Sequence, residues 1–148
     1  MKPLSAFFPR ILPYLPGCPE PLAAQVLVNA AIEFSEASLT LRQNLDTFKT
    51  FKGQVQYDLD PPSAQHDINR VMGVTLDGKE LTAGMAEAIR GDLPTAVAKP
   101  RGFYTDRTDS VFTLMLSPPP DGAYDVVVNV ALRPARAATQ LDDDLYNI

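Results

Sequence analysis

Residues 19–41 read PEPLAAQVLVNAAIEFSEASLTL, and this stretch decides how the rest of the chain can fold. Apolar residues recur in it at three- and four-residue steps, which places them along one side of an α-helix. Because a helix this apolar needs a covering surface, we expect residues 19–41 to form a long helix packed against the rest of the domain. The apolar stripe consists of Ala23, Leu27, Ala30, Phe34, Ala37 and Leu41, widened by Leu22, Val26, Val28 and Ile32.

The segment before this helix mixes prolines with large apolar side chains. Prolines at positions 3, 9, 13 and 16 exclude a continuous helix, so we expect an apolar arm of short turns or extended chain. An arm of this kind needs a groove, either on the chain's own sheet or on a neighbouring subunit, because apolar patches of this size are seldom left uncovered. The candidate contact residues of the arm are Leu4, Phe7, Phe8, Ile11, Leu12, Tyr14 and Leu15.

Strand patterns follow the long helix. Turn signals at Lys52-Gly53 and Asp77-Gly78 separate runs of alternating apolar residues, and residues 124–132 (YDVVVNVAL) form the strongest strand pattern. Residues 81–90 (LTAGMAEAIR) resemble a short helix that ends at Gly91. Runs of strands predict an α+β fold, in which an N-terminal arm and a long helix pack on a mostly antiparallel β-sheet with one short additional helix.

Length and composition limit the class of protein. The 148 residues are enough for one domain with its own core, and we divide them into an apolar Pro-rich arm (1–18), a single α+β domain (19–132) and a polar, acidic C-terminal tail (133–148). A net charge of -5 disfavours tight binding to nucleic-acid phosphates. One cysteine excludes an intramolecular disulfide and agrees with a reducing compartment. No apolar run reaches membrane-spanning length, and prolines interrupt the N-terminus too often for a signal peptide.

Few residues suggest chemistry. His66, the single histidine, lies in the polar stretch SAQHDIN, which indicates a surface histidine, although any Ser-His-Asp set would need it at the centre. Cys18 precedes the long helix and could be activated by the helix N-terminus, but it has no partner base other than His66. Asp142, Asp143 and Asp144 could bind a hard cation, yet a charge run near a chain end is more often solvated. We therefore expect no enzyme activity, no cofactor and no metal site.

The order of several motifs resembles the bacteriophage head-to-tail adaptor (connector or neck) proteins of tailed phages. The resemblance covers most of the chain, and each motif is a packing or turn motif, so it depends on their order. The matching segments are residues 30–38 (AAIEFSEAS), 57–59 (YDL), 71–81 (VMGVTLDGKEL), 116–134 (LSPPPDGAYDVVVNVALRP) and 141–146 (LDDDLY).

The resemblance implies a structural virion protein, made in the host cytoplasm and assembled in the phage neck. It implies a homo-oligomeric ring, commonly of twelve copies, that contacts the portal protein on one side and tail or nozzle proteins on the other. DNA would pass through the ring without specific binding, and no membrane would be involved. The expected contact residues of the C-terminal tail are Asp142, Asp143, Asp144, Leu145 and Tyr146.

Two other classes of function remain open. The chain could be a module that binds another protein, or another phage assembly protein such as a tail completion protein, with the arm or a sheet edge as its contact surface. It could also be a small enzyme that uses Cys18 or His66.

Overall fold

The computed structural model describes residues 1–84, 96–108 and 111–147. The chain divides into two compact units, each built from segments distant in sequence. Unit 1 consists of Met1–Leu41, Ser63–Asn69 and Leu132–Ile148, and unit 2 consists of Arg42–Pro62 and Arg70–Ala131. Unit 1 thus groups the arm, the long helix and the C-terminal tail, which the sequence division into 1–18, 19–132 and 133–148 had kept apart.

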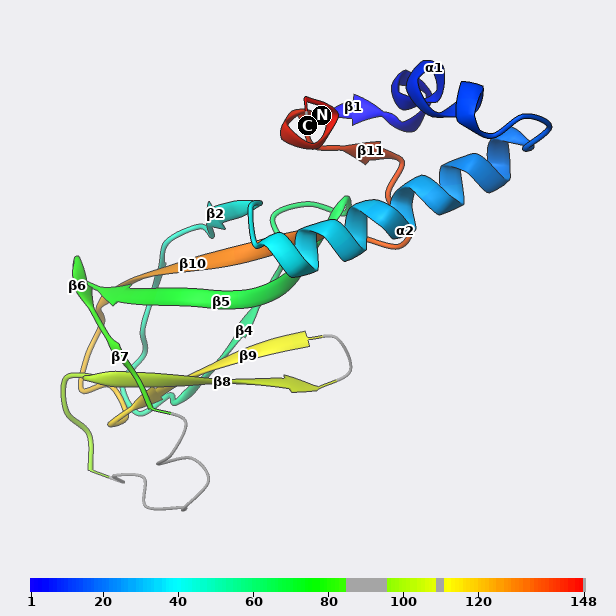
Figure 1. The fold of residues 1–148 in the computed structure, drawn as a ribbon. Helices are drawn as coiled ribbons and strands as arrows, with labels where there is room; N and C mark the ends of the chain where they lie inside the picture. Colours follow the sequence, from blue (N-terminus) through cyan, green and yellow to red (C-terminus); the bar gives the residue numbers. More distant parts are fainter. Residues whose placement is uncertain (85–95, 109–110, 148) are drawn as a thin grey trace. The chain divides into compact units, whose positions relative to one another are not determined.

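Unit 1 contains the described helices and a two-stranded sheet formed by the two ends of the chain. Strand β1 (Lys2–Pro3) pairs antiparallel with β11 (Gln140–Leu141), side by side in Figure 1. Between β1 and the long helix, the arm folds into three short turns, as its prolines require. These turns are the 3-10 helix η1 (Leu4–Phe7), α1 (Phe8–Ile11) and the 3-10 helix η2 (Leu12–Tyr14), and the last helix is α4 (Asp143–Tyr146).

The long helix is α2 (Glu20–Ser38), so the helix predicted from residues 19–41 is confirmed. It begins directly after Pro19, with Pro21 in its first turn, and it ends at Leu39, whose φ of 53° is left-handed. Its buried side chains are short: Ala23, Val28, Ala31 and Ser35. Short side chains let neighbouring segments approach the helix closely.

The core of unit 1 joins the arm, α2 and the C-terminal tail. Phe7, Ala31 and Leu141 form a buried cluster, with Leu141 only 1% exposed. The partly buried apolar side chains packed around this cluster are Leu4, Leu27, Leu145 and Tyr146. The surface that covers this part of α2 therefore comes from the two ends of the chain.

Unit 2 contains most of one sheet and the whole of another. The first has the order β2 (Arg42–Asn44), β10 (Asp125–Pro134), β5 (His66–Leu76) and β6 (Lys79–Glu80), and β3 (Phe48–Lys49) also pairs with β10. In this sheet, the first residues of β5 and the last residues of β10 belong to unit 1. The second has the order β4 (Gln56–Leu59), β9 (Val111–Ser117), β8 (Gly102–Thr108) and β7 (Thr82–Ala83). Strand β7 runs parallel to β8, whereas β8 and β4 both pair antiparallel with β9.

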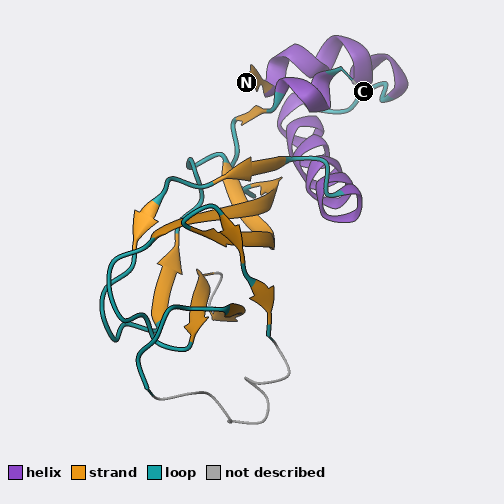
Figure 2. Cartoon of the chain, turned by 90° about the vertical axis from the view of Figure 1, so that its left-hand side faces the viewer, coloured by secondary structure: helices purple, strands orange, loops and turns teal. Residues whose placement is uncertain are grey.

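The core of unit 2 lies between these sheets, which are stacked in Figures 1 and 2. Val126, Val128 and Val130 alternate along β10 and are fully buried, as period-two alternation requires for one face of a strand. Leu114 and Leu116 of β9 are equally inaccessible. The valine-rich strand and the Asp77-Gly78 hairpin are both confirmed, and φ angles of 48° and 80° at Asp77 and Gly78 make the tight turn between β5 and β6.

The predicted fold class is wrong. Strands predominate over helices (40% against 26%) in three sheets, and α2 is the one helix of substantial length among the described residues. The α+β architecture failed because α2 has short buried side chains and packs on the arm and tail, not on a broad antiparallel sheet. The short additional helix predicted for residues 81–90 is not observed at Thr82–Ala83, which form β7, and its remainder from residue 85 lies outside the described residues.

Candidate interaction surface

The two sets of predicted contact residues lie together in unit 1. Phe7 is 7% exposed, and its ring meets the ring of Tyr146 edge to face, with 5.2 Å between centroids and an interplanar angle of 82°. The guanidinium of Arg10 lies 3.9 Å from the centroid of the Tyr146 ring, and its Nη1 donates to the Tyr146 carbonyl oxygen at 2.5 Å. Such aromatic and cation–π contacts hold α4 against the arm.

The first and last segments of the chain are joined by polar contacts as well. The N-terminal ammonium of Met1 lies 3.1 Å from Asp143 Oδ1, and the backbone N–H of Leu4 donates to the Thr139 carbonyl at 3.2 Å. Leu145 packs against the buried cluster, while Asp144 is exposed. Among these contact residues, the structure engages Leu4, Phe7, Asp143, Leu145 and Tyr146 within their own chain.

His66 is buried, so its prediction as a surface histidine is wrong. It is 8% exposed, its Nδ1 lies 2.8 Å from Ser63 Oγ, and its Nε2 lies 2.8 Å from Asp142 Oδ2. Because Asp142 is 76 residues further along the chain, the local polar sequence gave no sign of this partner. Hydrogen bonding from His66 is the main cause that lowers the pKa of Asp142, opposed by partial burial of the carboxylate.

The three side chains of a Ser-His-Asp set thus meet, and their connections serve the fold of unit 1. Ser63 and His66 belong to one turn, and Ser63 Oγ also accepts the backbone N–H of Gln65 at 3.2 Å. The side-chain carbonyl of Gln65 in turn accepts the N–H groups of Thr139 and Gln140, at 2.7 and 3.1 Å. Residues 63–66 therefore hold the C-terminal tail in place through these hydrogen bonds.

One side of α2 keeps an uncovered apolar surface. Leu22, Val26 and Phe34 are 54%, 49% and 40% exposed, and with exposed Ala30 they follow each other at four-residue steps. We call these four residues the α2 ridge. Phe34 also borders an apolar depression of about 190 Å³, whose lining residues are Phe7, Leu27, Ala31, Phe34, Leu141 and Leu145.

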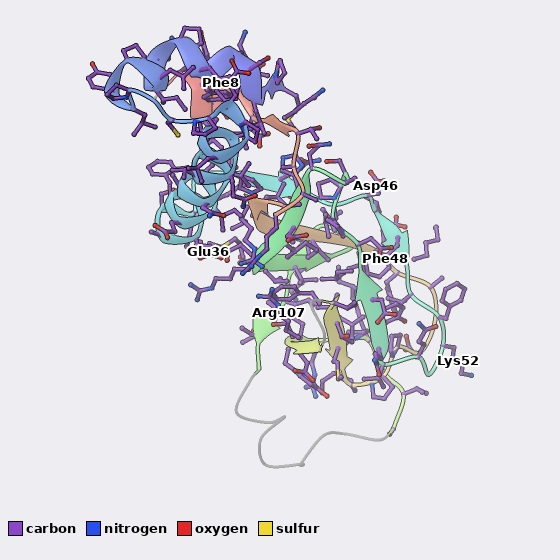
Figure 3. All side chains as sticks on the ribbon, turned by 90° about the vertical axis from the view of Figure 1, so that its right-hand side faces the viewer. Phe8, Glu36, Asp46, Phe48, Lys52 and Arg107 are labelled. Carbon is purple, nitrogen blue, oxygen red and sulfur yellow. The ribbon has the colours of Figure 1, made fainter. Side chains whose placement is uncertain are left out.

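The arm has its own exposed tip. Tyr14 is 84% exposed and Leu15 is 38% exposed, whereas Phe8, Ile11 and Leu12 are half-buried. Figure 3 shows Phe8 on the arm above α2. Among the predicted arm residues, Tyr14 and Leu15 keep the most accessible apolar surface.

Phe51 is an exposed aromatic residue that directly precedes the Lys52-Gly53 turn signal. It follows β3 and is 66% exposed. The Lys52-Gly53 turn signal was correct, since Gly53 has a φ of 78°, but β3 had already ended at Lys49. The turn signal was the available indication that Phe51 leaves the sheet.

The remaining candidates show no catalytic arrangement in the part of the chain that the structure describes. An open groove of about 400 Å³ in unit 2 contains Asp46, Asp58 and Asp60, but no group of three or more potential ligands among the described residues is placed to hold a metal ion. Cys18 is half-buried, with its Sγ 3.6 Å from the Pro19 carbonyl oxygen.

None of the described helices has the length and apolar character needed to cross a membrane. No protein-family model matches the sequence, and no curated protein matches it.

Proposed function

We propose that this protein is a structural subunit of the phage neck, a head-to-tail adaptor that forms a ring between the portal protein and the tail. The observation that carries this proposal is the α2 ridge, an apolar surface on a well-formed helix that remains exposed although both chain ends fold onto α2. Contiguous exposed apolar patches on soluble proteins mark interaction sites. The motif order described from the sequence gives the class of assembly.

A ring needs two different contact patches on each subunit. Head-to-tail contacts join patch to counter-patch, and they close into a ring if the rotation between subunits allows it. The α2 ridge supplies one apolar patch, and the arm tip at Tyr14 and Leu15 supplies a further one for a neighbouring protein such as the portal.

The charge of the chain agrees with this role. A net charge of -5 disfavours retention of DNA phosphates, so a ring of this protein would let DNA pass without specific binding. The role requires neither a cofactor nor a catalytic group. It places the protein in the virion neck after synthesis in the host cytoplasm.

The test is assembly of the purified protein, alone and with the portal protein of the same phage. Light scattering after size-exclusion chromatography gives the copy number, and negative-stain electron microscopy shows whether rings form. Replacement of Leu22 and Val26 by serine is expected to weaken assembly. The matched control replaces Val97 and Val111, each 45% exposed in unit 2, by serine.

A monomer that stays monomeric with and without the portal would overturn the proposal. A monomer that instead binds an unrelated protein would favour the binding-module alternative.

A further inference from the structure

The loop after β3 presents Phe51 on a fixed backbone. The backbone N–H of Phe51 donates to the Tyr57 hydroxyl at 3.0 Å, and its carbonyl accepts the N–H of Gln54 at 3.0 Å. Gly53 donates its N–H to the Pro120 carbonyl at 2.8 Å, and Tyr57 is itself only 7% exposed. A large aromatic side chain on a loop held at these points is preorganised for binding, because little further order has to be imposed on it.

The flanks of Phe51 are basic. Lys49 and Lys52 lie on either side of it in sequence, and Figure 3 shows Lys52 at the outer edge of unit 2. Lys49 is paired with Asp125 at 3.4 Å, whereas Lys52 has no ion-pair partner among the described residues. We call Phe51 and Lys52 the Phe51 knob. An apolar recess with a carboxylate beside it would complement the phenyl ring and the ammonium group of this knob.

The α2 ridge and its depression have this chemistry. An apolar cavity of about 150 Å³ accommodates benzene, so the depression of about 190 Å³ beside Phe34 is large enough for a phenylalanine ring. Helix α2 contains three glutamates and neither lysine nor arginine. Glu36 is paired with Arg133, but exposed Glu33, next to Phe34, has no ion-pair partner among the described residues.

Positive charges near the depression are already engaged. Arg10 stacks on Tyr146 and donates to its carbonyl, and the ammonium of Lys2 lies 5.0 Å from the centroid of the same ring. Glu33 lines a neighbouring polar groove with Arg133 and Arg136, where Arg133 is paired with Glu36, and no ion pair of Glu33 is formed among the described residues. Opposite charges at the rim of an interface guide encounter and fix the register of docking.

We propose that the Phe51 knob of one copy docks on the α2 ridge of a second copy, with the Phe51 ring in the depression beside Phe34 and Lys52 facing Glu33. The knob belongs to unit 2 and the ridge to unit 1, so the contact joins two different patches and is heterologous. This inference rests on the proposed function, because it identifies the contact between neighbouring subunits of the proposed ring. The contact itself can be tested without a ring.

The experiment uses full-length chains with Cys18→Ser, one carrying Lys52→Cys and the other Glu33→Cys. The chains are mixed after isotopic labelling of one of them and oxidised, and mass spectrometry identifies disulfide-linked mixed dimers. The expected result is a mixed dimer joined at positions 52 and 33. The mixed dimer should be lost when Phe51→Ser is added to the first chain. Lys79→Cys, on an exposed lysine of β6, replaces Lys52→Cys in the matched control.

Mixed dimers no more abundant than in the Lys79→Cys control would overturn the inference, as would mixed dimers that persist with Phe51→Ser. Circular dichroism of each variant confirms that a lost cross-link does not reflect unfolding. Rings that form on the portal without this cross-link would leave the proposed function standing and remove the Phe51 contact. A cross-link without rings would support the contact and count against the neck adaptor.

Discussion

Replacement of Phe7 by alanine should destabilise unit 1 far more than replacement of its neighbour Phe8. Phe7 is 7% exposed and packs with Ala31 and Leu141, whereas Phe8 is half-buried. Truncation of a buried phenylalanine typically costs about 3–5 kcal/mol, through lost burial and the cavity that remains. Phe8→Ala should cost less, because part of its side chain already contacts water and it does not belong to the buried cluster.

The edge-to-face pair with Tyr146 contributes a separable part of this free energy. Aromatic pairs of this geometry are worth about 0.5–1.5 kcal/mol beyond their burial. A double-mutant cycle with Phe7→Ala and Tyr146→Leu should return a coupling energy in that range.

Amide hydrogen exchange is the suitable measurement, because a chain with two units need not unfold in one step. The N–H of Leu4, bonded to the Thr139 carbonyl, reports on the joint between arm and C-terminal tail. A loss of about 3 kcal/mol corresponds to exchange roughly 100-fold faster. Equal acceleration by Phe7→Ala and Phe8→Ala, or none by either, would refute the packing described for the arm.

Three further predictions concern the hydrogen bond between His66 and Asp142, the Phe51 loop and the β5–β6 turn. Because the folded-state pKa of Asp142 is below its usual 3.8, its contribution to stability should be complete above that pH and be lost as the pH falls through the lower value. In an acid titration followed by circular dichroism, His66→Gln should remove most of this contribution. Tyr57→Phe should cost about 1 kcal/mol in urea unfolding, since the Phe51 N–H loses its acceptor. Gly78→Ala should cost about 1–2 kcal/mol in the same assay, because its φ is 80°.

Each of these predictions has an outcome that would contradict it. If the wild type and His66→Gln lost their circular dichroism signal at the same acidic pH, the His66–Asp142 hydrogen bond would not contribute to stability. Unfolding midpoints unchanged by Tyr57→Phe or by Gly78→Ala would contradict, respectively, the hydrogen bond to Phe51 and the left-handed turn.

The elements that sequence patterns predicted correctly are those determined by neighbouring residues. Helix α2 follows from its apolar periodicity, the β5–β6 hairpin from Asp77-Gly78, and β10 from its run of valines. Strands β1 and β11 have two residues each, and a pattern of two residues has no measurable period. The sheet that closes unit 1 was therefore beyond prediction.

Contacts between distant segments account for the errors. The stripe on α2 was read as a face for a sheet, but the ring of Phe7 and the side chain of Leu141 occupy part of it. His66 appeared solvated because its neighbours are polar, while the partner that buries it, Asp142, comes from the other end of the chain. The apolar periodicity of α2 indicated that one side of the helix is buried, but it did not indicate which segments pack against that side.

The pairing of arm and C-terminal tail also bears on folding during translation. Phe7 and Ala31 must wait for Leu141, which is synthesised roughly 5–20 s later at typical elongation rates of about 5–20 residues per second. During that interval the emerging arm and helix expose their apolar side chains beside the ribosome. The core of unit 1 can therefore form only after the C-terminal tail has been synthesised.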